Sequence, residues 1–171
     1  MSLRADADFR FERALQAWGS SLSRIAAAYS HDPADAEDLL QEILFAVWKA
    51  FGAFRGECSE RTFVFRVAHN RALSHIRRRV RTVSLSDDLG LADPRPDPAA
   101  RALASQATAR LRSAIRTLPE LVRQVVMLQL EGLTNAEIAE VLGVTPGNVA
   151  VRLTRGRKRL RELLDEEGPT A

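Results

Sequence analysis

Four polar side chains near the C-terminus are spaced to fall on one stripe of an α-helix. They are Asn148, Arg152, Arg155 and Arg159, separated by four, three and four residues, and an α-helix turns once every 3.6 residues or so. An Arg guanidinium can donate two hydrogen bonds to guanine, and an Asn carboxamide can pair in the same way with adenine. The stretch from Arg152 to Arg161 also contains no acidic residue, whereas ordinary solvated helices mix both signs. The pattern predicts binding to duplex DNA; the alternative is a helical hairpin with a solvated basic face.

Two short helices around a tight turn must position this stripe. Thr134 and Glu137 have the spacing of a capping box, so a helix should begin directly after Thr134. Gly143 suits the helix exit, and Thr145 followed by Pro146 opens the second helix as N-cap and first helical residue. The apolar side of the second helix is a separate packing face, made of Val149, Leu153, Gly156, Leu160 and Leu164. This is the pattern of a helix-turn-helix, whose second helix fits the major groove.

The rest of the chain is also predicted to be helical. Apolar residues at spacings of three and four predict helices over about residues 8–30, 33–52 and 61–79. Asp32 is expected to cap the second of these, with Pro33 at its first position. The expected packing faces are Phe11, Leu15, Trp18, Leu22, Ile25 and Tyr29; Leu39, Leu40, Ile43, Leu44, Val47, Trp48 and Phe51; and Phe63, Phe65, Val67, Ala68, Leu73 and Ile76. Two more helices are predicted at about 102–117 and 119–132.

A change in composition separates two groups of helices. The segment from Thr82 to Ala100 holds three Pro, one Gly and four Asp, which is typical of a linker. The sequence therefore predicts an all-α protein of two small helical bundles joined by a flexible linker. The predicted boundaries are 5–81 for the first domain, 82–101 for the linker and 102–166 for the second domain.

Charge and composition narrow the function classes. The chain has 171 residues, of which 46% are hydrophobic and 27% charged, which is typical of a soluble globular protein. Acidic residues cluster between Asp32 and Glu42, whereas Arg61–Arg81 carries seven Arg and no acidic residue. The acidic surface suits a basic or hydrogen-bonding protein partner, and the basic surfaces suit nucleic-acid phosphates.

Signals for catalysis, cofactors and membranes are weak. The single cysteine, Cys58, excludes a disulfide framework, and His31, His69 and His75 lack the spacing of metal ligands. No Gly-rich phosphate loop or nucleophile and base arrangement stands out, so we expect no enzyme activity, cofactor, metal or small-molecule substrate. The N-terminus lacks the apolar core of a signal peptide, and no stretch approaches the roughly 20 apolar residues of a membrane span. We expect a cytoplasmic protein with no membrane insertion of its own.

Three collinear segments resemble one protein family. They are DPADAEDLLQEILFAVWKAF, RTFVFRVAHNRALSHIRRR and LPELVRQVVMLQLEGLTNAEIAEVLGVTPGNVAVRLTRGRKRLRELL. Their order is that of the acidic helix, the Arg-rich helix and the helix-turn-helix in bacterial RNA polymerase sigma factors of the extracytoplasmic-function type. The resemblance covers about residues 11–164. It implies a subunit that binds core RNA polymerase and directs transcription initiation at specific promoters, and that is usually held inactive by an anti-sigma factor.

The resemblance implies roles for residues of the first domain. Core-polymerase binding is implied for Asp35, Asp38, Gln41, Glu42 and Phe45. They share a helix face with carboxylates that can pair with basic groups, although the residues alone favour a solvated first turn. Binding to the downstream promoter element is implied for Arg66, Asn70, Arg71, Arg77 and Arg78. Asn70 would contact an extruded base, and the four arginines would bind the neighbouring phosphates. Alternatively, Asn70 is an ordinary polar surface residue. Phe63 stands where the family usually has Trp, and we favour a core position for it over a stacking platform.

The same resemblance assigns the upstream promoter element to the helix-turn-helix. Base-edge or near-base contacts are implied for Asn148, Val151, Arg152, Thr154 and Arg155, and phosphate contacts for Arg157, Lys158 and Arg159. Family members commonly carry Thr at Asn148, a basic residue at Ala150, Ser at Val151 and Ala at Gly156. The first three differences alter groups that would point toward DNA, so the preferred upstream sequence cannot be transferred from relatives. Gly156 is expected to permit close helix packing.

A helix-turn-helix activator of the response-regulator type is the main competing hypothesis. Such proteins carry an α/β receiver or a ligand domain, whereas the N-terminal half here shows no strand pattern. An anti-sigma antagonist is a further alternative, disfavoured because it would not need two basic helices that face DNA.

Overall fold

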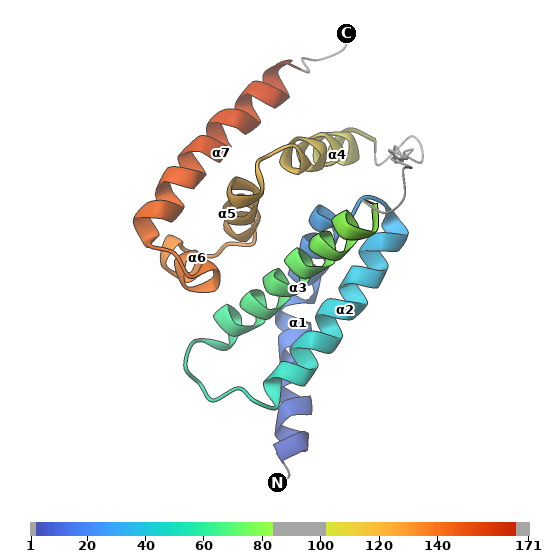
Figure 1. Ribbon diagram of the computed structural model, residues 1–171, viewed down its shortest axis with the longest axis vertical. Helices are drawn as coiled ribbons and strands as arrows, with labels where there is room; N and C mark the ends of the chain where they lie inside the picture. The colour runs from blue at the N-terminus through green and yellow to red at the C-terminus, as the bar shows by residue number, and fades with distance from the viewer. Residues whose placement is uncertain (1–2, 84–101, 167–171) are drawn as a thin grey trace. The chain divides into compact units, whose positions relative to one another are not determined.

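Seven helices make up the described part of the chain (Figure 1). The computed structural model describes residues 3–83 and 102–166, with side chains from 6 to 80 and from 106 to 165. The helices are α1 (Leu3–Tyr29), α2 (Pro33–Phe51), α3 (Glu60–Val83), α4 (Ala102–Arg116), α5 (Glu120–Leu130), α6 (Asn135–Leu142) and α7 (Pro146–Glu166). Since no strand occurs among these residues, the predicted all-α class is confirmed.

The helices belong to two compact units. Unit 1 is Met1–Ala92 and contains α1 to α3, and unit 2 is Asp93–Ala171 and contains α4 to α7. Within the predicted linker, Thr82 and Val83 continue α3, and the other residues of that segment lie outside the described residues. The exact domain boundaries therefore stay a prediction.

Side-chain caps fix the starts of α2 and α3. Asp32 Oδ1 accepts a 2.8 Å hydrogen bond from the backbone N–H of Asp35, with Pro33 as the first helical residue, as predicted. Ser59 Oγ accepts a 3.0 Å hydrogen bond from the backbone N–H of Thr62. This second cap was not predicted, and with it α3 begins at Glu60, one residue before the predicted start.

The core of unit 1 lies where its three helices meet. Its largest fully buried side chains are Leu22, Ile25, Leu39, Ile43, Val47, Val64 and Phe65. Two predicted packing residues are instead well exposed, Leu15 at 41% and Trp48 at 37%. Small residues, Ala7 and Ala14, occupy the buried positions at the start of α1, so a pattern of large apolar residues selects the wrong side there. Trp48 lies at the edge, where its indole N–H donates a 2.8 Å hydrogen bond to an Asp8 carboxylate oxygen.

Unit 2 contains the predicted helix-turn-helix as α6 and α7. Thr134 and Glu137 form the capping box, and Gly143 ends α6 with a φ of 66°, a conformation that favours glycine. Thr145 Oγ1 then accepts a 3.2 Å hydrogen bond from the backbone N–H of Asn148 at the start of α7. The largest fully buried side chains around this motif are Val125, Leu128, Leu133, Ile138 and Val149.

Close approach of α7 to α5 depends on Gly156, which is buried. A Cβ atom at this position would lie 2.6 Å from Val126 Cγ2 and 3.0 Å from Val122 Cγ1. Both distances are shorter than ordinary van der Waals contact. The expected role of Gly156 in close packing is confirmed.

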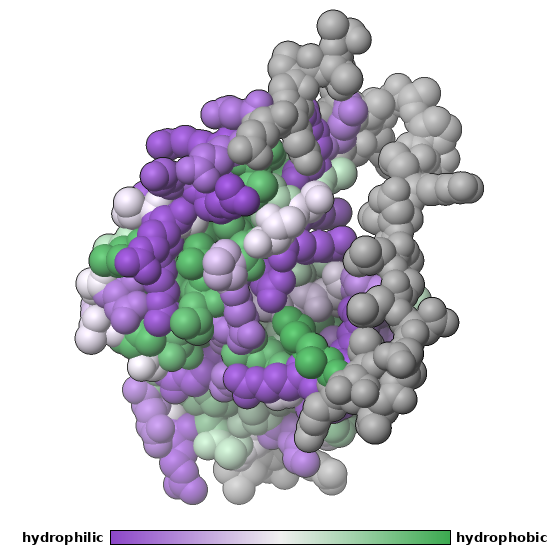
Figure 2. Space-filling view, turned by 45° about the horizontal axis from the view of Figure 1, so that its top comes forward, coloured by the Kyte–Doolittle hydropathy of each residue, from purple (hydrophilic) through white to green (hydrophobic). Residues whose placement is uncertain are grey.

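The described helices differ from membrane spans. None of them is both long enough and apolar enough to cross a bilayer. On the face seen in Figure 2, hydrophilic side chains surround smaller hydrophobic patches.

Candidate functional site

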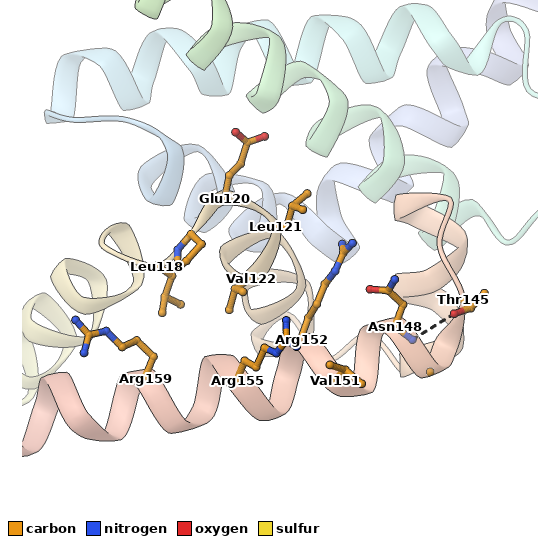
Figure 3. A pocket seen from close by; sticks show the side chains of 12 residues that line it. Leu118, Glu120, Leu121, Val122, Thr145, Asn148, Val151, Arg152, Arg155 and Arg159 are labelled. Carbon is orange, nitrogen blue, oxygen red and sulfur yellow. Dashed lines mark hydrogen bonds between the residues drawn. The ribbon is translucent and has the colours of Figure 1, made fainter.

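A groove of about 920 Å³ lies between the start of α5 and one face of α7 (Figure 3). One side consists of residues 118–122, and the other of Thr145, Gly147, Asn148, Val151, Arg152, Arg155 and Arg159. In Figure 3 the side chains of Asn148 and Arg152 extend from α7 toward α5, whereas Glu120 points away from α7. The groove therefore combines apolar side chains with guanidinium groups and a carboxamide, which can donate to base edges or phosphates.

Residues predicted to bind the upstream promoter element divide between this groove and its surroundings. Asn148, Val151, Arg152, Arg155 and Arg159 line the groove, while Thr154, Arg157 and Lys158 are exposed on α7 outside it. The Thr154 hydroxyl donates a 3.0 Å hydrogen bond to the Ala150 carbonyl, so its proton is already used within the helix. Arg159, predicted to meet phosphate, shares the groove with the base-contact candidates.

Most of the cationic groups on α7 are available to an external anion. Arg159 pairs with Glu162 at 3.2 Å. Arg152, Arg155, Arg157 and Lys158 make no ion pair with another residue in the described ranges. A helix surface with several uncompensated cations attracts phosphates by long-range electrostatics as well as by direct contact.

On α2 the five residues predicted to bind core polymerase do not form one uniform surface. Asp38 and Gln41 are exposed, and Phe45 is 61% exposed with its ring 5.9 Å from that of Trp48. Asp35 and Glu42 are turned toward α3, with side chains 15% and 27% exposed. The outer part of this surface thus offers a carboxylate, a carboxamide and an aromatic ring.

Asp35 lies at the centre of a hydrogen-bonded cluster. His31 approaches it through its backbone N–H at 3.1 Å and its Nδ1 at 3.0 Å, and His75 Nε2 lies 2.7 Å from the other carboxylate oxygen. Burial raises the pKa of Asp35, but the hydrogen bonds from His31 and His75 outweigh it and hold the pKa below the ordinary 3.8. The described residues include no group of His, Cys, Asp and Glu arranged to hold a metal ion, so this is a polar cluster that joins α2 to α3.

Glu42 pairs with two arginines that were predicted to bind DNA. Its carboxylate lies 3.0 Å from Arg71 Nε, and its two oxygens lie 2.9 and 2.6 Å from an Arg78 terminal nitrogen. The predicted downstream set therefore splits along α3. Arg71 and Arg78 pair with Glu42 on α2, and Arg78 is exposed as well. Asn70 and Arg77 are exposed, and Arg66 is half-buried.

An aromatic cluster closes the end of unit 1 beside the loop between α2 and α3. The ring of Phe63 lies 4.4 Å from that of Phe54 and 5.6 Å from that of Phe51. Phe63 is half-buried, so the favoured core position is correct in part. Phe54, in the loop between α2 and α3, packs against both of these rings.

Several residues around these surfaces were not singled out from the sequence. They are His31, His75 and Arg79 beside Asp35, and Leu118, Leu121 and Val122 in the groove. One signal was available. It is the spacing of the charged residues. Arg71, His75 and Arg78 are spaced by four and three residues, and Asp35 and Glu42 by seven. Each set therefore falls on one stripe of its helix, with basic side chains on one helix and acidic side chains on the other.

Comparison with known proteins gives the same relatives for both units. Residues 14–82 match the family model of sigma-70 region 2, and residues 108–160 match that of sigma-70 region 4. The chain is 34% identical over 152 residues to the ECF RNA polymerase sigma factor SigE of Mycolicibacterium smegmatis, covering 82% of this chain and 56% of that protein. It is 30% identical to the ECF RNA polymerase sigma factor SigM of Mycobacterium tuberculosis, covering 91% and 78%.

A solved structure shows the same fold. It is the sigma factor RpoE in complex with the anti-sigma factor NepR from Bartonella quintana, with a TM-score of 0.78 and 26% identity. The match covers 91% of this chain and 96% of that one.

Proposed function

This chain belongs to the extracytoplasmic-function (ECF) family of RNA polymerase sigma factors, and we propose that it binds core RNA polymerase and directs initiation at specific promoters. One observation carries the proposal. A helix-turn-helix whose α7 carries several cations without an ion pair to any other described residue follows, in the same chain, a three-helix unit. The α2 helix of that unit presents exposed Asp38, Gln41 and Phe45.

In this proposal core polymerase docks on α2 of unit 1. Asp38, Gln41 and Phe45 make the outer contacts, and Glu42 contributes at the edge. Asp35 belongs to the same surface, but its main role is to hold α2 against α3 through His31 and His75. The exposed positions of Asp38, Gln41 and Phe45 support these separate roles, because a side chain must be accessible to a partner to lie at the centre of an interface.

Promoter DNA is proposed to contact both units. On α3, Asn70 contacts an extruded base of the downstream element, and Arg66, Arg71, Arg77 and Arg78 hold the phosphates beside it. On α7, the residues proposed to face the bases of the upstream element are Asn148, Val151, Arg152, Thr154 and Arg155. Its phosphate backbone is proposed to meet Arg157, Lys158 and Arg159. Two units of modest DNA affinity in one chain bind a promoter selectively, because once one unit is bound the second contact becomes intramolecular.

An anti-sigma factor is proposed as the third partner. The related sigma factor from Bartonella quintana is in complex with one, and the exposed surfaces named above are those that an inhibitor would need to cover. We place the protein in the cytoplasm, where core polymerase and DNA are found. Its role requires binding alone and no covalent chemistry by this chain.

Pull-down of core polymerase by the purified chain, in the absence of DNA, tests the proposal. A sigma factor should retain the polymerase, and Phe45→Ala should weaken retention because it removes the most exposed aromatic of the α2 surface. A response-regulator type activator would bind its DNA site without retaining core polymerase. Binding of DNA with no capture of core polymerase would therefore refute the proposal.

A further inference from the structure

Val151 is a large apolar side chain that is exposed on α7. About half of it, 51%, is accessible to solvent, and it lines the groove beside α5. Figure 3 shows it along α7 between Asn148 and Arg155. Covering an aliphatic side chain is favourable, so an exposed valine among hydrogen-bond donors offers a different kind of contact from its neighbours.

The surface next to Val151 is also poor in hydrogen-bond donors. Ala150 and Thr154 are both exposed, and Ala150 has no polar side-chain atom. The Thr154 hydroxyl donates to the Ala150 carbonyl at 3.0 Å, so its hydrogen is not available to a base. Ala150, Val151 and Thr154 thus form an aliphatic patch, and the donors of Asn148 and Arg155 lie to either side of it.

The major groove offers one apolar group that such a patch can recognise. Each base pair presents a distinct set of donors and acceptors there, and thymine alone adds a C5 methyl group. The N-terminal residues of a recognition helix are those that reach base edges. Because α7 begins at Pro146, Val151 lies in the second turn of the helix, within this part.

We propose that Val151 is a specificity-determining residue that contacts the C5 methyl group of a thymine in the upstream promoter element. Asn148 and Arg155 bind the hydrogen-bonding edges of neighbouring base pairs. The inference deepens the proposed function and rests on it, since it assumes that α7 enters the major groove of that element.

The test begins with an upstream element selected from a randomised duplex by the full-length chain bound to core polymerase. Each thymine of the selected element is then replaced singly by uracil, which keeps the hydrogen-bonding groups and lacks only the methyl group. At one position the replacement should lower the affinity about fourfold, as expected for one methyl group that is no longer buried. Fluorescence anisotropy measures the ratio of the two affinities.

Cytosine and 5-methylcytosine at the same position provide a second ratio. Methylation should raise the affinity by a similar factor, because it places a methyl group on the same ring carbon. In the Val151→Ala variant both ratios should fall to about one, whereas an effect of the methyl group on DNA shape alone would persist. Val151→Thr keeps one of the two methyl groups, so its ratios should lie between those of the wild type and Val151→Ala.

Val80→Ala is the matched control. Val80 is an exposed valine of α3, with 63% of its surface accessible, and it belongs to unit 1. The same substitution there should leave both ratios at their wild-type values.

Two results would overturn the inference: a selected element in which no replacement of thymine by uracil changes the affinity, or ratios that Val151→Ala leaves unchanged. Unchanged ratios together with weaker retention of core polymerase would assign Val151 to a protein contact instead. All of these outcomes leave the sigma function standing as long as the wild-type chain retains core polymerase and supports initiation. Loss of those two activities in the wild type would refute the function itself.

Discussion

Arg155 and Lys158 lie three residues apart on α7 but in different surroundings. Arg155 lines the groove beside α5, while Lys158 is exposed outside it. We predict that Arg155→Ala relaxes the preference at one base position of the upstream element, at a cost of about 1–3 kcal/mol. Lys158→Ala should instead weaken binding evenly across sequences and reduce the salt slope by about 0.9.

Binding selections with a randomised duplex measure both effects. Lys49→Ala serves as the control, because it removes one exposed cation from α2, in the unit that is proposed to bind the downstream element instead. If Arg155→Ala and Lys158→Ala weaken every sequence to the same extent, the division of α7 into base and phosphate contacts is wrong.

Asp35 predicts a pH dependence of the stability of unit 1. Because the hydrogen bonds from His31 and His75 hold its folded-state pKa below 3.8, its charge stabilises the fold at pH values above the unfolded-state pKa. That contribution is lost as the pH falls through the folded-state pKa. The wild type should therefore be more stable than Asp35→Asn at neutral pH, and the difference should narrow below about pH 4.

Urea unfolding followed by tryptophan fluorescence isolates this effect. Both tryptophans, Trp18 and Trp48, lie in unit 1, so the signal reports on that unit. Asp38→Asn is the control, since Asp38 is exposed and makes no ion pair with another described residue. A difference between wild type and Asp35→Asn that stays constant down to about pH 3 would contradict the role given to the cluster.

At the scale of elements, the packing of α7 on α5 depends on the absence of one methyl group. Gly156→Ala should gain about 1 kcal/mol in helix propensity but place a Cβ 2.6 Å from Val126 Cγ2. Overpacking of this kind costs about 1–3 kcal/mol, and valine is too stiff to move aside. We expect a net loss of about 1 kcal/mol in unit 2, seen as faster hydrogen exchange in α5 and α7.

Two further variants decide whether the clash is the cause. Gly147 lies on the same helix, and a Cβ added there would meet nothing within 4 Å, so Gly147→Ala should not destabilise unit 2. In the background of Val126→Ala, which removes the closer of the two contacts and leaves that with Val122, Gly156→Ala should cost less than in the wild type. An equal cost in both backgrounds would show that the contact with Val126 is not responsible.

Helix ends were predicted well from the sequence where one or two capping residues determine them. Asp32 and Pro33, Thr134 and Glu137, Gly143 and Thr145 each act through their own backbone neighbours, and such caps are visible in a sequence. The start of α1 was harder, because Ala7 and Ala14 are buried while larger apolar residues nearby are not. Small residues at a helix contact carry little hydrophobic signal, although they allow close approach.

Contacts between helices could not be predicted from single segments. The partners that Asp35 and Glu42 find on α3 lie 40 residues further along the chain for Asp35 and 29 and 36 residues for Glu42. Their pairing depends on how α2 and α3 pack. The groove beside α7 likewise requires α5, which was recognised only as a packing helix. Charge stripes of matching spacing were present on both α2 and α3, but the sequence alone does not say which stripes meet.

For the whole molecule, the central feature is that two different interfaces share one chain. Unit 1 offers an acidic and aromatic surface on α2 beside an Arg-rich α3, and unit 2 offers a basic recognition helix. Either unit alone would explain a protein-binding or a DNA-binding module. Their combination fits a subunit that brings polymerase to a promoter, since tethering multiplies two modest affinities.

Run-off transcription with purified core RNA polymerase and a randomised promoter library tests this claim most directly. We predict that the folded wild-type chain supports initiation from a subset of promoters with a common upstream and downstream element, and that core polymerase alone does not. Initiation should fall when both Asn70 and Arg155 are replaced by Ala, which removes one proposed base contact in each unit. A folded chain that directs initiation from no promoter in the library would contradict the proposed function.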